Sequence, residues 1–258
     1  MKKYMKNLTV EEVSFPHQRY VLIKLTDQLP LPDILPGQFV EVKVDGAPNT
    51  FLRRPISVNY VDRNKNQLWL LIQLVGEGTR TLAKLTPGDC LNVVFPLGNG
   101  FSMPTDTNCD ILLVGGGVGV APLLYYGEQL KDKGFKPFFL LGARTNNDLL
   151  QIPLFQQFGE VFITTEDGSM GEKGFVTNHS VLGKKAFSHI ACCGPKPMMM
   201  SVARYALANN IPCQVSLENM MACGLGACLC CVEKTVKGNV CVCKEGPVFD
   251  IRQLTWEL

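Results

Sequence analysis

The cysteines near the C-terminus are the residues best suited to chemistry in this sequence. Cys223, Cys228 and Cys231 are separated by four and then two residues, and Cys243 comes after eleven more. The pattern C-x4-C-x2-C with a distant fourth cysteine is typical of plant-type [2Fe–2S] clusters. Glycines within the run leave the backbone free to adopt the unusual dihedral angles of a tight loop around a cluster. The spacing therefore predicts a [2Fe–2S] site.

Zinc is the main alternative to an iron–sulfur cluster as the group that these thiols bind. Zinc sites more often pair one C-x2-C with a second, or with histidines, and no histidine follows His189. The ligand set itself stays open, because Cys230 and Cys241 are two further thiols in the same region. Cys230 would give C-x-C spacing, which favours Cys231 instead. Spacing alone does not choose between Cys241 and Cys243.

Two glycine turns and one basic turn could hold phosphate. "GGGVGVAP" follows an apolar run and precedes a helical stretch, so Gly117 and Gly119 could hold a pyrophosphate at a helix N-terminus. The match departs from G-x-G-x-x-G by ending in Pro122, and a simple tight turn is the other interpretation. "RRPIS" could grip a phosphate through arginine, and "GEGTRT" through backbone amides. Taken singly, both could equally be ordinary surface turns.

The elements that must position these residues change character along the chain. Residues 1 to about 103 contain short strands at 39–44, 68–75 and 90–95, broken by turn signals, which indicates an antiparallel barrel or sandwich. In the first of these, Val40, Val42 and Val44 alternate with Glu41 and Lys43. That alternation predicts a half-buried strand with both charged residues on the exposed face.

From about residue 109 the pattern becomes strand–helix alternation, which predicts a parallel sheet. Strands are expected at 110–116, 136–143, 160–166 and 189–195, and helices at 122–133 and 197–209. Glu166 and Asp167 close the third of these strands. Near an adenosine ribose they would repel a 2′-phosphate and favour NAD. We expect three domains: a β-barrel (1–103), an α/β domain (104–215) and a cysteine-rich domain (216–258).

Composition excludes several classes of function. The 258 residues carry 25 basic and 23 acidic side chains, a net charge of +2 that gives no case for nucleic-acid binding. The longest apolar run, 111–126, is broken by four glycines and a proline, too short and interrupted for a membrane span. No secretion signal is visible, and no G-x-S-x-G or H-E-x-x-H motif occurs. We expect a cytoplasmic protein of electron transfer, in which disulfides are disfavoured.

The chain resembles the ferredoxin–NADP reductase superfamily, and more closely the electron-transfer subunits of class 1B (NAD-dependent) dihydroorotate dehydrogenases. The resemblance rests on "LRRPISV", "VGEGTRTL", "GGGVGVAP", "LGART", "TTEDGSMGEKGFVT", "CGPKPMM", "CGLGACLCCV" and "VCKEGPVFD", in this order. It implies an FAD-binding β-barrel, an NAD-binding α/β domain and a C-terminal [2Fe–2S] domain.

The resemblance also implies particular site residues. It assigns the following to FAD: Arg54, Pro55, Ile56, Ser57, Leu71, Ile72, Gln73, Gly78 and Thr79. The family's last cluster ligand stands just before "KDGPVF", here "KEGPVF", which selects Cys243. Cys241 and Cys230 are then departures from the family pattern.

In that family a partner subunit holds FMN and oxidises dihydroorotate to orotate in pyrimidine biosynthesis. The resemblance implies that electrons pass through [2Fe–2S] and FAD to NAD+, in a heterotetramer with two copies of each subunit. This chain alone should not oxidise dihydroorotate. The same-fold alternative is a reductase subunit serving ferredoxin or sulfide-linked electron transfer, whose members tend to carry aspartate at the position of Cys223. A zinc-bearing interaction module with a nucleotide-sensing domain is the alternative from another class.

Overall fold

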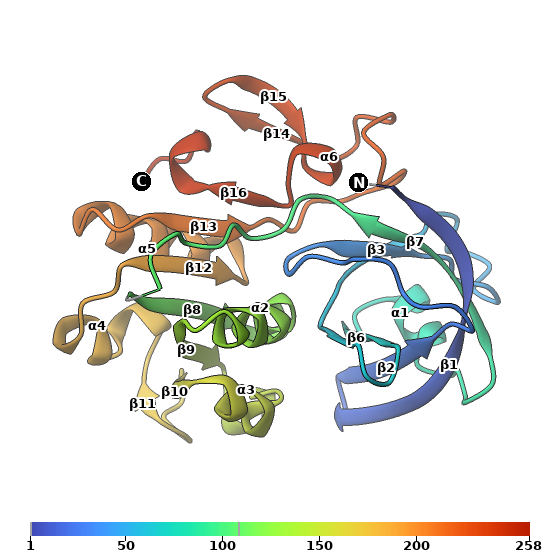
Figure 1. Cartoon of the computed structure of the whole chain (residues 1–258), viewed down its shortest axis with the longest axis horizontal. Coiled ribbons are helices and arrows are strands. Elements are labelled where there is room, and N and C mark those ends of the chain that lie inside the picture. Colours follow the sequence, from blue (N-terminus) through green and yellow to red (C-terminus); the bar gives the residue numbers. More distant parts are fainter. Residues whose placement is uncertain (1, 108) are drawn as a thin grey trace.

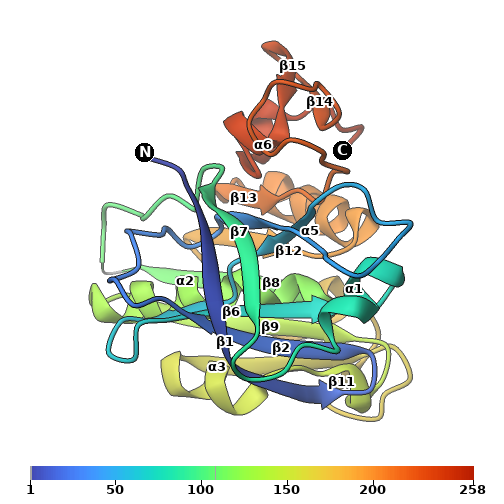
Figure 2. The same ribbon diagram turned by 90° about the vertical axis from the view of Figure 1, so that its right-hand side faces the viewer.

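The computed structural model describes residues 2–107 and 109–258. Two seven-stranded sheets lie side by side, and the C-terminal segment runs along the top of the molecule where they meet (Figure 1). Figure 2 looks onto the first sheet, with the second behind it. The predicted combination of an antiparallel β part, a parallel α/β part and a small C-terminal part is confirmed.

The first sheet is antiparallel throughout, with strand order β4-β3-β7-β1-β2-β6-β5. Strand β4 at one end also contacts β6, so the sheet curls into a half-barrel around an apolar core. Its elements are β1 (Tyr4–His17), β2 (Tyr20–Thr26), β3 (Phe39–Val42), β4 (Arg54–Ser57), β5 (Tyr60–Asp62), β6 (Gln67–Gln73), β7 (Cys90–Leu97) and the helix α1 (Glu77–Leu82).

The prediction that one face of β3 is exposed to solvent was wrong. The strand ends at Val42, and all four of its residues are buried, including Glu41. Its alternation was expected to leave Glu41 in water. The C-terminal segment covers that face instead: a Cβ on Gly224 would lie 2.7 Å from Glu41 Cγ. Local periodicity cannot reveal a cover supplied from so far along the chain.

The second sheet has the order β11-β10-β9-β8-β12-β13-β16, parallel except for β16. Helices α2 and α3 pack on one face and α4 and α5 on the other. The elements are β8 (Asp110–Gly116), η1 (Gly117–Val120), α2 (Ala121–Asp132), β9 (Lys136–Ala143), η2 (Asn146–Asp148), α3 (Ile152–Phe158), β10 (Glu160–Thr165), β11 (Glu172–Lys173), η3 (Val176–Asn178), α4 (Val181–Lys184), β12 (His189–Cys193), α5 (Lys196–Ala208) and β13 (Cys213–Ser216).

The C-terminal segment is anchored to both sheets. It forms the hairpin β14 (Val232–Thr235) and β15 (Gly238–Cys241), then α6 (Val242–Glu245), β16 (Val248–Asp250) and η4 (Ile251–Gln253). Strand β16 extends the second sheet. Cys231 and Cys243 share a core cluster with Phe39 and Leu97 of the half-barrel. The three-domain division therefore stays a prediction, because the third part has no core of its own separate from this cluster.

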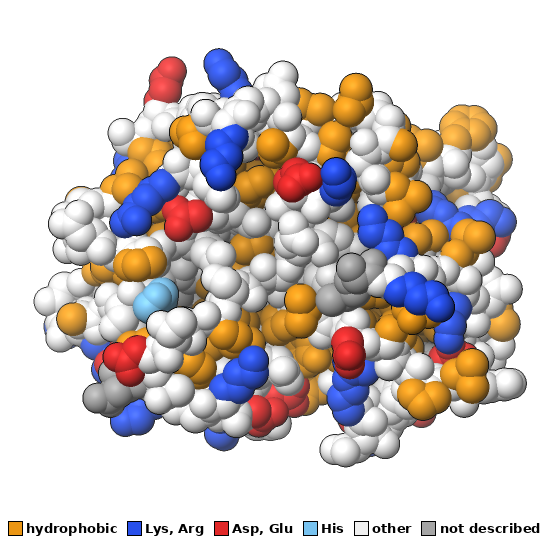
Figure 3. All heavy atoms as spheres, turned by 45° about the horizontal axis from the view of Figure 1, so that its top comes forward, with side chains coloured by type: hydrophobic (Ala, Val, Ile, Leu, Met, Phe, Trp, Pro, Cys, Tyr) orange, Lys and Arg blue, Asp and Glu red, His pale blue; other side chains and the backbone are white. Residues whose placement is uncertain are grey.

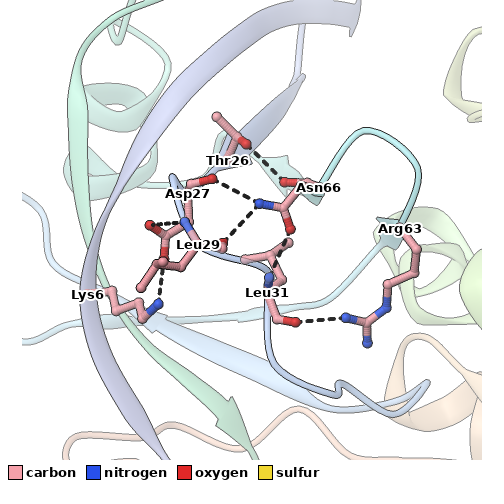
Figure 4. A network of polar contacts seen from close by, with 7 residues as sticks. All are labelled: Lys6, Thr26, Asp27, Leu29, Leu31, Arg63 and Asn66. Carbon is pink, nitrogen blue, oxygen red and sulfur yellow. Dashed lines mark hydrogen bonds and ion pairs between the residues drawn. The ribbon is translucent and has the colours of Figure 1, made fainter.

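A polar network fixes the segment that follows β2 (Figure 4). The Asn66 amide donates to the carbonyls of Asp27 (2.9 Å) and Leu29 (3.0 Å), and its oxygen accepts from the Leu31 N–H at 2.8 Å. Arg63 holds the Leu31 carbonyl at 3.0 Å. This pinned segment continues to Ile34, whose carbonyl accepts from Tyr125 of α2 at 3.3 Å. The network thus positions a segment of the half-barrel that is hydrogen-bonded to α2 of the second sheet.

Further contacts join the two sheets directly. Asn59 donates to the Ala121 carbonyl and exchanges amide hydrogen bonds with Gln151, all at 2.9–3.0 Å. Asn59 is fully buried, so these bonds satisfy an amide that water cannot reach. Within 2–107 and 109–258, none of the helices has the length and apolar character needed to cross a membrane.

Candidate functional site

The cysteine-rich loop between β13 and β14 has the backbone of a tight wrapping turn. Gly224 (φ +64°), Gly226 (φ +82°) and Leu229 (φ +59°) all adopt left-handed conformations. Glycine occupies such conformations without steric penalty, which explains two of the three residue choices. The loop therefore reverses direction repeatedly over a short span, as its sequence predicted.

These turns aim backbone N–H groups at sulfur. The N–H groups of Leu225 and Ala227 lie 3.3 and 3.4 Å from Cys223 Sγ. The N–H of Gly226 lies 3.1 Å from Cys243 Sγ, which joins the loop from α6. Hydrogen bonds to the sulfurs tune an iron–sulfur cluster. The donor set thus fits thiolate ligands, and the loop geometry is compatible with the cluster that the spacing predicts.

Five thiols gather at this loop, one more than a cluster needs. They are Cys223, Cys228, Cys231, Cys241 and Cys243. In the described part of the chain, no three side chains converge closely enough to hold a metal ion together. The assignment of Cys223, Cys228, Cys231 and Cys243 as ligands therefore stays a prediction, supported by spacing and by the N–H donors.

Two of these thiols have opposite electrostatic surroundings. Burial raises the pKa of Cys223, but backbone N–H groups, that of Leu225 foremost, and a hydrogen bond with Cys228 outweigh it and bring the pKa to about 6. Burial and then the neighbouring Cys231 raise the pKa of Cys243 to about 12. Cys223 is thus ready to act as a thiolate near neutral pH, whereas Cys243 needs a cation to lose its proton.

Glu41 lies directly beneath this loop and is an isolated carboxyl. It is 0% exposed, and neither carboxyl oxygen has a hydrogen-bond partner among the described residues. Burial raises the pKa of Glu41 to about 7, against the opposing charges of Arg53 and Arg54, and Cys223 adds to the rise. A buried carboxyl without partners avoids ionisation, so Glu41 is protonated at mildly acidic pH.

We expect Glu41 to make the protein less stable as pH rises. Its folded pKa is raised from 4.5 to about 7, so its stabilising contribution is complete below pH 4.5 and is lost as pH rises through 7. The loss amounts to about 3 kcal/mol. Glu41→Gln, which cannot ionise, should therefore gain stability over the native chain between these pH values, as measured by denaturant unfolding at several pH values.

The exposed Glu11 of β1 supplies the matched control. Glu11→Gln should show the same pH profile as the native chain. If Glu41→Gln also kept that profile, Glu41 would not be the buried acid described here.

A cavity of about 640 Å³ lies between the two sheets. From the second sheet it is lined by the C-terminal ends of the parallel strands, including Gly116, Glu166 and Gly194. From the half-barrel it is lined by Tyr20 and Gln73. Ligands of open α/β sheets bind at this edge of the strands, so the cavity is the candidate nucleotide site.

The predicted glycine turn forms part of the cavity wall, with Gly117 and Gly119 both lining it. At Gly117 the backbone has a left-handed conformation, with φ at +56°, which favours glycine. At Gly119 there is no room for a side chain, because a Cβ there would lie 2.5 Å from the Cys193 carbonyl oxygen and 2.5 Å from Gly194 Cα. The turn therefore packs directly against the strand end of β12.

Glu166 and Asp167 are separated by the structure. Glu166 lines the cavity, as its place at the strand end predicted. Asp167 is exposed and instead accepts from the Ser169 hydroxyl at 2.6 Å. Only Glu166 is thus positioned to meet a bound nucleotide.

The predicted FAD residues belong to β4, β6 and α1 of the half-barrel, and Gln73 among them lines that cavity. Arg54 of β4 and Gly78 of α1 are in contact, since a Cβ on Gly78 would lie 3.2 Å from Arg54 Nε. The "RPIS" strand and the "GEGT" turn thus come together. Pro55, Ile56 and Ser57 are half-buried in β4. Their role in binding FAD stays a prediction.

Other members of that predicted set already have structural partners. Leu71 and Ile72 are core residues of β6, so only their backbones are available to a ligand. The Thr79 hydroxyl accepts from the N–H groups of Val75 (3.1 Å) and Gly76 (3.2 Å) at the start of α1. Thr79 therefore shapes the turn, and Gln73 is the member that reaches the cavity.

Sequence reasoning missed several cavity residues. Arg19 lies in the β1–β2 turn and Tyr20 is the first residue of β2. Arg19 forms an ion pair with Asp148 of η2 across the cavity edge. Met198 and Glu218 also line the cavity. A β-hairpin predicted from the N-terminal strands would have placed Arg19 at a turn, but no local signal shows that this turn meets the cavity. No local signal marks Glu218, because its place depends on where β13 falls in the sheet order.

An antiparallel half-barrel beside a parallel nucleotide-binding sheet, with a cavity between them, defines the ferredoxin–NADP reductase class of fold. The oxidoreductase NAD-binding domain family matches residues 113–204, and the iron–sulfur cluster binding domain of dihydroorotate dehydrogenase B matches residues 218–255. The chain belongs to the family of electron transfer subunits of dihydroorotate dehydrogenase B (NAD(+)).

Individual relatives support this membership. The subunit of that name from Caldanaerobacter subterraneus subsp. tengcongensis is 40% identical over 220 residues, covering 83% of this chain and 84% of the relative. That from Shouchella clausii is 36% identical over 98% of this chain and 99% of its own. Among solved structures, the NADH-dependent reduced ferredoxin-NADP oxidoreductase is similar with a TM-score of 0.87 and 27% identity, over 98% of this chain and 91% of the other.

Proposed function

We propose that this chain is the electron-transfer subunit of an NAD-linked dihydroorotate dehydrogenase. Electrons from the FMN of a catalytic subunit would pass through a [2Fe–2S] cluster and FAD to NAD+, in the pathway of pyrimidine synthesis. The FAD and the cluster, when bound, supply the redox chemistry, one or two electrons at a time. The protein's own residues bind these groups and set their surroundings.

One observation carries the proposal: the three candidate sites adjoin one another. Gly224 of the cysteine loop packs on Glu41 of β3, and β3 pairs with β4, the "RPIS" strand. On the other side, Gln73 of the half-barrel faces the cavity that the glycine turn lines. This succession of the candidate cluster, flavin and nicotinamide sites supports a relay of electrons through the chain.

The residues of each candidate site would bind a different group. Arg54, with the backbone of the Gly78 turn, would hold FAD phosphate. Gly117 and Gly119 would let the chain approach the pyrophosphate of NAD closely. Cys223 and the other three predicted ligands would hold the cluster, with backbone N–H groups stabilising the negative sulfurs.

The partner would dock on the side that carries the cysteine loop. Leu225 and Leu229 of the loop are 48% and 65% exposed, Met220 before it 84%, and Phe51 beside the "RPIS" strand 90%. Figure 3 looks onto the side of the molecule where the C-terminal segment lies and shows hydrophobic side chains at the surface among the charged ones. A contiguous apolar patch marks an interaction site, and these exposed side chains support docking on this side of the molecule. We propose a heterotetramer of two copies of each subunit, in the reducing cytoplasm.

The test is reconstitution. The cofactor-loaded chain would be mixed anaerobically with an FMN-bearing dihydroorotate dehydrogenase subunit from the same source, and NADH formation from dihydroorotate followed. NADH should appear only in the mixture. If the chain oxidised NADH with artificial acceptors but never coupled to dihydroorotate, a reductase serving ferredoxin, as its structural likeness suggests, would replace this proposal.

The choice of nicotinamide cofactor gives a separate prediction. Glu166 lies at the cavity edge, where its carboxylate would repel a 2′-phosphate and accept from a ribose hydroxyl. Glu166→Arg should therefore raise kcat/KM for NADPH relative to NADH by at least about tenfold, or 1.4 kcal/mol. Steady-state reduction of ferricyanide measures both. Asp167→Arg, at the neighbouring exposed position, is the matched control, and an equal shift in both variants would remove Glu166 from this role.

A further inference from the structure

Cys241 is not one of the four predicted ligands, but it contacts the predicted cluster loop. It ends β15, two residues before Cys243, and both residues approach the same glycine of the loop. The Cys241 thiol donates to the Gly226 carbonyl at 3.8 Å, and the Gly226 N–H lies 3.1 Å from Cys243 Sγ. The two sulfurs thus flank one residue of the loop.

The same predicted ligand also neighbours both thiols. The Cys243 N–H lies 3.4 Å from Cys231 Sγ, and Cys231 acts electrostatically on both the Cys241 and the Cys243 thiol. The Val242 N–H, between the two, donates to the Cys231 carbonyl at 2.9 Å. This bond holds Val242, the residue between the two cysteines, against the loop.

The surroundings of Cys241 differ from those of Cys230, the other cysteine of this region outside the predicted ligand set. Cys223 and Cys228, like Cys231, act electrostatically on the Cys241 thiol, so three of the four predicted ligands are near enough to influence it. Cys230 is exposed, and its position would require C-x-C spacing. Cys241 is partly exposed, whereas Cys243 is 1% exposed.

We propose that Cys241 is a reserve ligand of the cluster, able to take the place of Cys243 on iron. The inference rests on the proposed cluster. In the exchange one iron–sulfur bond to Cys243 breaks and one to Cys241 forms. The proton of the Cys241 thiol passes to Cys243, and no oxidation state changes. The short Cys241–Cys243 segment needs only to re-orient against a loop that both side chains already contact.

The test compares four variants of the full chain: C243S, C241S, C241S/C243S and, as the matched control, C230S/C243S. Iron and acid-labile sulfide are measured after anaerobic purification, and the reduced proteins are compared by EPR. Far-UV circular dichroism establishes folding. The native chain and C241S should hold about two irons per chain. C243S and C230S/C243S should keep a cluster with altered EPR g-values, and C241S/C243S should have none.

Two results would overturn the inference alone: a folded C243S as devoid of iron as the double variant, or a C241S/C243S that retains its cluster. A native chain without iron would overturn the proposed cluster and this inference together.

A second measurement leaves Cys243 in place, in case its replacement prevents folding. Native holoprotein and C241S are treated with iodoacetamide, and the labelled positions are mapped against iron retained. Slow labelling of Cys243 in native protein that keeps its iron is expected, with protection in C241S until iron is lost. Labelling of Cys243 that tracks iron loss equally in both proteins would overturn the inference.

Discussion

Cys223→Ser is expected to abolish NADH formation from dihydroorotate in the reconstituted complex, down to the level of either subunit alone. Burial raises the pKa of Cys223, but the backbone N–H groups of Leu225 and Ala227, together with Cys228, bring it to about 6. Serine keeps the volume but does not ionise at neutral pH, so it loses the thiolate that iron requires. NADH oxidation by ferricyanide should persist, because that reaction uses only the flavin and nicotinamide sites.

The contrast between the two assays makes this prediction specific. Cys230→Ser removes an exposed thiol of the same loop and should leave both activities at the native level. EPR of the reduced protein should lose its cluster signal in Cys223→Ser alone. Retained coupling in a Cys223→Ser protein without a cluster would show that electrons reach the flavin by another route.

Gly119→Ala is expected to impair nicotinamide binding and stability together. The added Cβ would lie 2.5 Å from the Cys193 carbonyl oxygen and 2.6 Å from the Gly194 nitrogen. Both atoms belong to the backbone, so the turn after β12 has to move rather than a flexible side chain. Overpacking of this kind costs about 1–3 kcal/mol of folding free energy. The displaced turn lines the cavity, so KM for NADH should rise by at least about tenfold.

Gly183→Ala is the matched control, because Gly183 lies in α4 with nothing within 4 Å of an added Cβ. It should gain about 0.5–1 kcal/mol from helix propensity and keep the native KM. Ferricyanide-linked kinetics and thermal unfolding report the two effects separately. A Gly119→Ala protein with lowered stability and unchanged KM would place the glycine turn outside the nicotinamide site.

The structure supports a binding role for some of the predicted site residues more directly than for others. The glycine turn and Glu166 lie in one cavity, as expected from strand ends in a parallel sheet. Arg54 and Gly78 lie together, although their turns are separated by β5 and β6. Thr79 already serves the local fold, so a phosphate at that turn would rely on backbone amides.

The sequence by itself determined the features that depend on short spacing. Cysteine spacing indicates a [2Fe–2S] loop because ligands to one cluster must come from a tight turn. Strand-then-helix alternation indicates the parallel sheet, and the predicted elements at 110–116, 122–133 and 136–143 match β8, α2 and β9 within one residue. Local backbone chemistry decides these features, so a local pattern records them.

Only the tertiary structure decided what packs across long sequence separations. Glu41 was expected in water and is buried, because Gly224 covers it from the other end of the chain. Arg19 and Glu218 line one cavity because the two sheets meet there. The Cys241 thiol reaches the cysteine loop at the Gly226 carbonyl because the end of β15 folds back on that loop. These contacts follow from sheet order and from the packing of distant segments, which hydrophobic periodicity along one strand does not encode.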